Sequence, residues 1–351
     1  MKNKNWASNH WQQLLVATLV ILVFCFWLFL YPHILTMREQ SQLFLWTWDY
    51  FTERITTPGG FAQYIAECLV QFFRNPVYGA CIYAILFLLT YGLSRQLLGN
   101  KYPLLSFLPP LALWGLSLFP YIPLTPTIAI ILLMTWLAFL PQQKKGKTIS
   151  LIILLPVIFW MTGPGIADYY WEEERKSTLE EMRYDLMVRM KDWTGIVEEF
   201  HRHPSPSLAI QHAERLAEYY LKRIPEEDLY RADVFSNLSL HSESSAFIMD
   251  EVYFHLGLVN MSQRATFEAM ESIPSHNKSG RALSRLVETS LITGQYEVAL
   301  KYISILEDTS LYRTWARKIK PLAEHPQLIR QHPVYRRLQE IYQQTDDTFF
   351  Y

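Results

Sequence analysis

The chain has 351 residues, half of them hydrophobic, and its 32 Lys and Arg nearly balance its 33 Asp and Glu. The balance hides an asymmetry, because the first 164 residues carry ten basic and four acidic residues, whereas the remainder has an acidic excess. The acidic excess gives no support to nucleic-acid binding, which needs a basic face to neutralise phosphates. The three cysteines all lie before residue 82, which excludes a disulfide framework or a cysteine metal site in the second half.

The first half has the pattern of a membrane domain. An uncharged run from Leu14 to Tyr31 is long enough for a helix to cross a bilayer. No small-residue cleavage site follows it, so we expect an uncleaved anchor. Four further spans are predicted, at Val77 to Leu93, Tyr102 to Tyr121, Ile122 to Leu140 and Ile149 to Ile166. Prolines in the third of the five predict a kink there.

One further apolar segment, Phe61 to Phe73, is short, amphipathic and interrupted by Glu67. It is predicted to lie along the membrane surface, with a sixth span as the alternative. The lysine cluster at residues 144–147 favours a cytoplasmic loop before the last span. The remainder of the chain is therefore expected outside the cytoplasm, in the periplasm of a Gram-negative cell, with the spans in the inner membrane.

The second half shows helix after helix, separated by short breaks. The stretch LITGQYEVALKY contains Gly294, Tyr296 and Ala299, which fit the G-x-Y-x-x-A turn of a tetratricopeptide-type hairpin. Ser262 and Ala265 lie 34 residues before Tyr296 and Ala299, which is the tetratricopeptide period.

A third partial match, at Trp193 and Ile196, stands 69 residues before the second, close to two periods. Small residues at such positions let helices approach, and aromatic residues fill the space between hairpins. The sequence thus predicts an all-α fold: a polytopic helical membrane domain (1–166, about five spans plus an interfacial helix) and a tetratricopeptide-like α-solenoid of three to four hairpins (167–351). An irregular helical bundle with chance spacing is the alternative.

Four stretches carry a family resemblance: MREQSQLFLWTWDYF, PGGFAQYIAECLVQFF, VYFHLGLVNMSQRATFEAMESIP and KSGRALSRLVETSLITGQYEVALKYISIL. They resemble a family of Bacteroidota membrane proteins known as the domain of unknown function numbered 6057. The resemblance implies membrane spans followed by helical repeats, and it implies no catalytic residues. It also implies members that tend to be longer, with more spans and more repeats, so a shortened member is one of the hypotheses for this chain.

Asp49, within QLFLWTWDYF, and Glu53 are the acidic candidates for catalysis. They are one helical turn apart and are expected outside the membrane near its surface. C-type glycosyltransferases have a similar layout, in which an acidic residue helps to bind a metal or acts as a base toward an acceptor hydroxyl. The alternative is a solvated acid, paired with Arg38 or Arg54, on an aromatic-rich interfacial helix.

Other motifs give little support to an enzyme. His201 and His203 form an H-x-H pair, but no third ligand lies near them in the sequence, so no metal is predicted. His255 fits a packed position inside a helix. The sequence has no Gly-rich phosphate loop, G-x-S-x-G or H-E-x-x-H, so no cofactor is predicted.

These observations favour a non-enzymatic inner-membrane protein whose periplasmic repeat domain binds or organises a protein partner. The rival is a glycosyltransferase-like enzyme, or a remnant of one, acting on lipid-linked sugars with Asp49 and Glu53 as its acids. A third hypothesis is a shortened family member without an independent role, whose product would be unstable.

Overall fold

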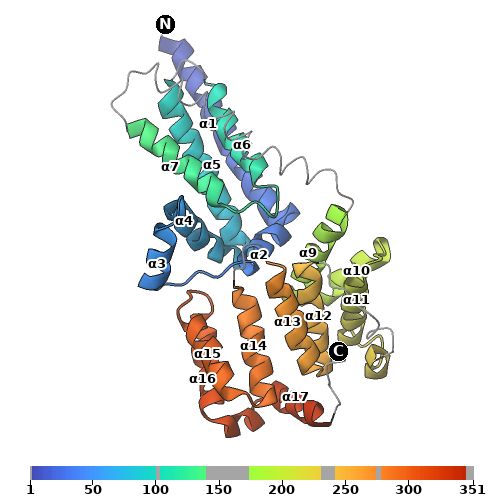
Figure 1. Cartoon of the computed structure of the whole chain (residues 1–351). Coiled ribbons are helices and arrows are strands. Elements are labelled where there is room, and N and C mark those ends of the chain that lie inside the picture. The colour runs from blue at the N-terminus through green and yellow to red at the C-terminus, as the bar shows by residue number, and fades with distance from the viewer. Residues whose placement is uncertain (1, 100–102, 140–173, 231–241, 274–277, 345–351) are drawn as a thin grey trace. The chain divides into compact units, whose positions relative to one another are not determined.

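The computed structural model describes residues 2–99, 103–139, 174–230, 242–273 and 278–344 (Figure 1). Within these residues every regular element is helical and no strand occurs, which confirms the prediction of an all-α protein. The chain divides into two compact units. The first comprises Met1–Glu39 and Trp48–Glu172, and the second comprises Gln40–Thr47 and Glu173–Tyr351.

The first unit is a bundle of mostly apolar helices. Its α-helices are α1 (Lys2–Cys25), α2 (Pro32–Gln40), α3 (Trp48–Ile55), α4 (Gly60–Val70), α5 (Pro76–Leu98), α6 (Leu108–Leu116) and α7 (Thr125–Phe139). Short helices of other types extend three of these: η1 (Phe26–Leu30) follows α1, η2 (Gln71–Arg74) follows α4, and η4 (Leu105–Phe107) precedes α6.

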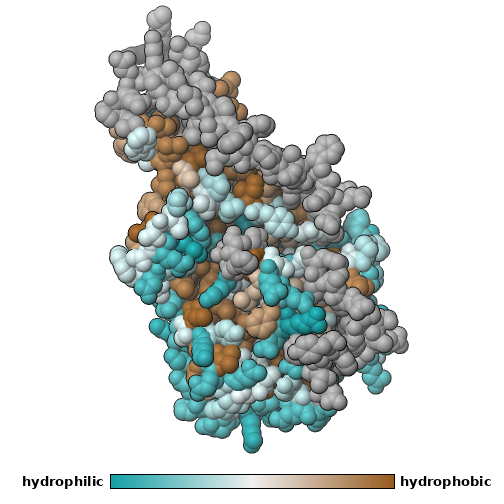
Figure 2. Space-filling view, in the orientation of Figure 1, coloured by the Kyte–Doolittle hydropathy of each residue, from teal (hydrophilic) through white to brown (hydrophobic). Residues whose placement is uncertain are grey.

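Two helical segments among the described residues are long and apolar enough to cross a membrane, Trp11–Leu30 and Pro76–Leu98. Large apolar side chains on the first of them point outward, and Leu14 and Phe29 are 69% and 71% exposed. Figure 2 shows hydrophobic surface gathered over the helices of this unit. The first and second predicted spans therefore coincide with long apolar helices.

The count of five spans is not supported. The predicted spans Tyr102 to Tyr121 and Ile122 to Leu140 contain only the shorter helical segments Leu105–Leu116 and Thr125–Phe139. At 1.5 Å per residue these are roughly 18 and 22 Å long, less than a hydrocarbon core of roughly 30 Å. The fifth predicted span, Ile149 to Ile166, lies outside the described residues.

Prolines set where these shorter helices begin. Pro109 and Pro110 lie in the first turn of α6, where the missing N–H has no intrahelical acceptor to lose. Pro126 occupies the second position of α7. Pro109 and Pro110 thus lie where the 3-10 helix η4 gives way to α6, and this change of helix type is what the structure shows in place of a kinked long span.

Helices α3 and α4 are joined through a buried carboxylate. Glu67 of α4 accepts hydrogen bonds from Tyr50 Oη at 2.6 Å, from Arg54 Nε at 3.0 Å and from Gln63 Nε2 at 2.9 Å. Burial and the neighbouring Glu67 raise the pKa of Tyr50, so its hydroxyl stays a donor. The middle of the predicted amphipathic segment Phe61 to Phe73 is thus helical, and its carboxylate contacts α3 instead of water.

The second unit consists of helices packed largely as hairpins (Figure 1). Its α-helices are α9 (Glu174–Met190), α10 (Trp193–Arg202), α11 (Leu208–Tyr220), α12 (Glu243–Leu256), α13 (Val259–Glu271), α14 (Gly280–Thr293), α15 (Tyr296–Glu307), α16 (Arg313–Glu324) and α17 (Pro333–Gln344). Two 3-10 helices, η5 (Glu226–Tyr230) and η8 (Pro326–Gln331), complete it. Each helix from α9 to α15 packs against the next α-helix along the chain.

Three hairpin turns, after α9, α12 and α14, have the same backbone. Each has one residue with positive φ: Lys191 at 56°, Gly257 at 79° and Gly294 at 81°. The N–H of the next residue then bonds to a carbonyl five residues back, which is the Schellman turn. These bonds join Asp192 to Met187 (2.9 Å), Leu258 to Tyr253 (2.9 Å) and Gln295 to Ser290 (2.8 Å).

The spacing of the last two turns, 37 residues, differs from the predicted period of 34. Val259 and Ser262 therefore take the places that Tyr296 and Ala299 have in the next hairpin, and Ala265 lies one turn further on. The register shifts because eight residues separate α13 from α14, whereas two separate the helices within each hairpin. Ser262, Ala265 and Ala299 are all buried at helix contacts, in agreement with their small size.

A short segment from the first half of the sequence, Gln40–Thr47, belongs to the second unit. Its Leu43 joins the apolar core formed by α14 to α17, and Phe44 is also buried. The Trp46 N–H donates to the carbonyl of Asp308 at 2.9 Å, in the turn between α15 and α16. The first six residues of QLFLWTWDYF, expected in a loop along the membrane, therefore complete the core of the hairpin unit.

Candidate functional site

Helix α12 carries two acidic residues into the interior of the second unit. It is buried almost all round because α9, α11 and α13 pack against it. The helix begins with a capping box, in which Ser242 Oγ accepts the Ser245 N–H and Ser245 Oγ accepts the Ser242 N–H, both at 3.0 Å. Asp250 and Glu251 follow in the apolar stretch AFIMDEVYF, and Asp250 is only 1% exposed.

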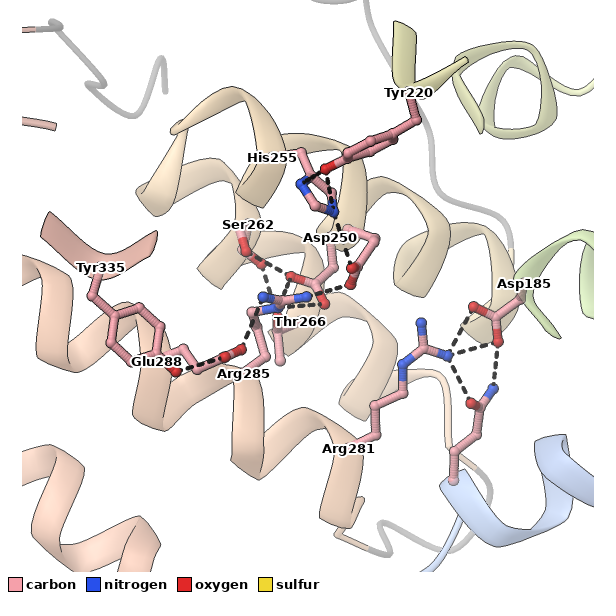
Figure 3. A network of polar contacts seen from close by, with 12 residues as sticks. Asp185, Tyr220, Asp250, His255, Ser262, Thr266, Arg281, Arg285, Glu288 and Tyr335 are labelled. Atoms are coloured by element: carbon pink, nitrogen blue, oxygen red, sulfur yellow. Dashed lines mark hydrogen bonds and ion pairs between the residues drawn. The ribbon is translucent and has the colours of Figure 1, made fainter. Parts of the chain in front are cut away.

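Arg285 of α14 is the centre of a buried ionic network (Figure 3). Its Nε lies 3.0 Å from Asp250 Oδ1, its Nη1 lies 2.9 Å from Glu288 Oε2, and its Nη2 pairs with Glu251. The guanidinium carbon also lies 3.7 Å from the ring centroid of Phe254, a cation–π contact. One cation thus serves three carboxylates on two helices.

Burial and charge act in opposite directions on these groups. Burial alone would lower the pKa of Arg285, but the surrounding carboxylates outweigh it and raise the pKa, so the guanidinium stays charged. Burial raises the pKa of Asp250 and of Glu288 despite Arg285. For Glu251, burial also acts to raise the pKa, but Arg285 and His255 outweigh it and lower the pKa. Glu251 is therefore the most firmly ionised of the three acids.

Hydroxyl groups from two more helices complete the network. Ser262 of α13 donates to Asp250 Oδ1 at 2.6 Å, and Tyr335 of α17 donates to Glu288 Oε1 at 2.9 Å. Burial and the nearby Glu288 raise the pKa of Tyr335, which keeps its proton on the hydroxyl. The repeat-signature residue Ser262 thus has a polar role in addition to its small size.

A histidine extends the network to α11. His255 Nε2 lies 3.3 Å from Glu251 Oε1, and the Tyr220 hydroxyl forms a hydrogen bond with the same imidazole. Burial and Glu251 raise the pKa of Tyr220 to about 12. The Tyr220 ring stacks on Trp193, another signature residue, with centroids 4.5 Å apart. His255 lies in the last turn of α12, with its side chain 25% exposed and packed edge-on against the Tyr220 ring.

A second arginine, one turn before Arg285, fixes the segment that begins at Gln40 (Figure 3). Arg281 Nη1 lies 2.7 Å from Asp185 Oδ2 on α9 and donates to Gln40 Oε1 at 2.8 Å. Gln40 Nε2 in turn donates to Asp185 Oδ2 at 3.1 Å. The Arg281 guanidinium lies 4.3 Å from the ring centroid of Phe247.

This ionic network links the helices α12, α14 and α17 to one another. Its central groups, Asp250 and Arg285, are 1% and 8% exposed and satisfy one another.

A cavity in the first unit, lined by residues that include Tyr83, Thr90 and Trp114, has a volume of about 20 Å³. That is room for about one water molecule, too little for a substrate.

The acids predicted as catalytic alternatives lie on the surface. Asp49 is in the first turn of α3, and Glu53 follows one turn later; both are exposed. Arg54 lies 3.8 Å from Glu53 but makes its closer pair, at 3.0 Å, with Glu67. Arg38 is buried and donates to backbone carbonyls after α6. Among the described residues, Asp49 belongs to no group of three side chains placed to hold a metal ion.

The other signature residues occupy structural positions. Ile196 is buried in the core of α9 to α12, and Tyr296 begins α15 and packs on the core of α14 to α17. Gly294 forms the left-handed turn that its place in the motif predicts.

Sequence reasoning missed the Arg285 network. Its one local signal was Asp250 with Glu251 between the apolar triplets FIM and VYF, because acids in the middle of an apolar helix are buried only with partners. Arg285 lies 35 residues from Asp250, and nothing in its own surroundings, GRALSRLVETS, distinguishes it from a solvated arginine.

Together these features define a class: an all-α protein that joins a bundle of apolar helices to a unit of helical hairpins built around a buried ionic network. The chain belongs to the Family of unknown function (DUF6057), whose model matches residues 8–170 and 166–351. The resemblance stated from the sequence is confirmed at the level of this family. No curated protein matches the chain, and no solved structure matches it.

Proposed function

We propose that this chain is a multi-pass protein of the bacterial inner membrane whose helical-hairpin unit, on the periplasmic side, binds or organises a protein partner. The observation that carries the proposal is the repeated hairpin with a common Schellman turn, in α9–α10, α12–α13 and α14–α15. Stacked two-helix units of this kind, of which tetratricopeptide repeats are one, form extended surfaces that bind other proteins.

The division of chemistry between the units supports the same proposal. The ionised groups of the Arg285 network lie inside the second unit, where they hold α12, α14 and α17 together. The first unit contains the helical segments Trp11–Leu30 and Pro76–Leu98, with large apolar side chains facing outward. Lipid tails are the environment that such side chains prefer. The short helix α4 would then lie near the membrane surface.

Photocrosslinking in living cells tests partner binding without removing any part of the unit. A photoreactive amino acid is placed at Phe267 on α13, at Leu208 on α11, or at Ile303 on α15 as a matched apolar control. Phe267 and Leu208 are 42% and 44% exposed, whereas Ile303 is fully buried. We expect one protein, the same for both exposed positions, to be cross-linked and Ile303 to give no product. Only lipid, or a heterogeneous background, at both exposed positions would refute the proposal.

Orientation has a separate test, because the second unit has no cysteine of its own. In a chain with Cys25, Cys68 and Cys81 replaced by serine, Ser304→Cys adds one exposed thiol on α15. A maleimide that crosses the outer but not the inner membrane is expected to label it in intact cells. Labelling only after the inner membrane is lysed would place the unit in the cytoplasm.

Asp49→Asn separates this proposal from the rival transferase. The carboxylate is exposed and no described side chain relies on it, so the variant is expected to keep its cross-linked partner and its cellular phenotype. Loss of the phenotype with an intact cross-link would favour an enzyme acting on lipid-linked sugars.

A further inference from the structure

A second cluster of ionisable side chains lies on the hairpin of α10 and α11, apart from the Arg285 network. His201 is in the last turn of α10, and Glu214 and Glu218 are one turn apart on α11. One nitrogen of the imidazole and one oxygen from each carboxylate all lie within 4.8 Å of one another. The cluster therefore combines the two ligand types, imidazole and carboxylate, from two packed helices.

The two glutamates lack the cation that neighbouring acids have. Glu199 on α10 pairs with Arg183 and Arg202, and Glu198 also pairs with Arg202. By contrast, no hydrogen bond or ion pair joins the Glu214 or Glu218 carboxylate to another side chain in the described part of the chain. Arg202 of this hairpin is thus engaged with Glu198 and Glu199, and Arg215, which follows Glu214 in the sequence, makes no ion pair with it in the described part of the chain.

The electrostatics show two carboxylates held close together. Burial, followed by the charge of Glu218, raises the pKa of Glu214. His201, Arg215 and Arg223 act in the opposite direction but do not cancel the rise. A bound divalent cation would relieve the repulsion between the two glutamates, which no arginine at ion-pair distance does.

We propose that His201, Glu214 and Glu218 form a binding site for a divalent transition-metal ion of the Zn²⁺ type. One imidazole and two carboxylates are a ligand set that such ions take, with bond lengths of about 2.0 to 2.2 Å and a remaining position for water or a further ligand. In a tetrahedral site these bond lengths place the ligand atoms roughly 3.3 to 3.6 Å apart. The three ligand atoms now lie within 4.8 Å of one another, so rotations of these exposed and half-exposed side chains would bring them to the ion. The metal would tie α10 to α11.

His203 provides a matched control from the same H-x-H pair. It caps the end of α10, is exposed, and is not among the clustered ligands. If the two histidines of the H-x-H pair bind the metal together, replacing either one should reduce the metal affinity equally. If the three-residue site binds it, only His201 should matter.

The test is calorimetric titration of Zn²⁺ into the full-length protein, purified in detergent and stripped with a chelator. We expect one ion per chain, with affinity reduced at least ten-fold by His201→Ala, Glu214→Gln or Glu218→Gln and unchanged by His203→Ala. Absence of binding, equal loss in His203→Ala, or retention of full affinity in the three site variants would overturn the proposal.

A second measurement needs no substitution. Diethyl pyrocarbonate modifies accessible histidines, and mass spectrometry of the unaltered chain distinguishes the peptide positions of His201 and His203. We expect Zn²⁺ to protect His201 while His203 remains modified. Equal protection of both, or of neither, would refute the site even if a variant failed to fold.

Discussion

Replacing Arg285 by methionine tests whether the buried ionic network stabilises the second unit. Methionine keeps the apolar stem beside Phe254 but leaves Asp250, Glu251 and Glu288 without their shared cation. Breaking a buried ion pair by removing one partner costs about 3 to 5 kcal/mol. For a unit of this size, about 2 to 4 °C of melting temperature is lost per kcal/mol, so we expect a fall of roughly 6 to 20 °C at pH 7.

The same variant has a defined pH dependence. Without the guanidinium, burial and mutual repulsion hold the folded-state pKa values of Asp250, Glu251 and Glu288 above their unfolded values. A carboxyl whose pKa is raised on folding stabilises the protein at low pH and loses that stabilisation as pH rises through the folded pKa. The stability difference between the native protein and Arg285→Met should therefore shrink as pH falls from 7 toward 5, because the buried carboxyls of the variant take up protons. Glu251, whose pKa is lowered in the native protein, loses its own contribution only at pH values below its unfolded pKa.

Unfolding of the second unit alone can be followed through a buried thiol. Ser290 on α14 is fully buried and its hydroxyl has no hydrogen-bond partner, so Ser290→Cys is a mild change. With Cys25, Cys68 and Cys81 replaced by serine, this thiol reacts with a maleimide fluorophore only when the unit opens. The temperature of half-maximal labelling then reports the stability of that unit in the full-length protein.

Arg336→Met is the matched control. Arg336 is an exposed arginine on α17, 3.9 Å from Glu340, and such surface pairs contribute about 0 to 1 kcal/mol. Its labelling temperature should change by no more than a few degrees. A loss in Arg285→Met no larger than in Arg336→Met, or a deficit that grows at acidic pH, would refute the role assigned to the network.

Two smaller predictions use the same thiol assay. Gly294→Ala should lower the free energy of unfolding by about 1 to 2 kcal/mol, because alanine is strained in the left-handed backbone at this position. Gly257→Ala should lower it further, because the new Cβ would also lie 2.6 Å from Ile341 Cγ2. Equal losses in the two variants would contradict the steric contact with Ile341. Ser262→Ala removes a donor to the buried Asp250 and should cost about 1 to 3 kcal/mol, although the Cβ remains; an unchanged labelling temperature would show that the hydrogen bond contributes nothing.

The elements that the sequence predicted well are those determined by local chemistry. The apolar run from Leu14 to Tyr31 falls within one long helical segment apart from its last residue, because apolar side chains continue without interruption. Gly294 lies at a left-handed turn, where the absence of a Cβ avoids strain. By contrast, composition alone could not divide the apolar stretch between residues 102 and 140, where Pro109 and Pro126 begin new helices.

The partners of the buried polar groups could not be predicted from the local sequence pattern. Asp250 and Glu288 both pair with Arg285, and Tyr335 donates a hydrogen bond to Glu288. These groups come together only after α12, α14 and α17 pack against one another. On its own helix a charged residue has the same pattern whether it faces water or a partner. The cluster of His201 with acids on α11 was hidden for the same reason, since its ligands are 13 and 17 residues apart in the sequence.

The segment Gln40–Thr47 gives the second unit a discontinuous chain, with consequences for the order of folding. Its indole contact from Trp46 to Ser310 closes a loop of 264 residues. Leu43 leaves the ribosome before the helices whose core it joins, α14 to α17, are synthesised. Long-range contacts of this kind slow folding, because the closure entropy is lost before the contact is gained. The segment Gln40–Thr47, which is made before the other residues of the second unit, is therefore among the last of them to be buried. A fragment beginning at residue 173 would lack part of its own core.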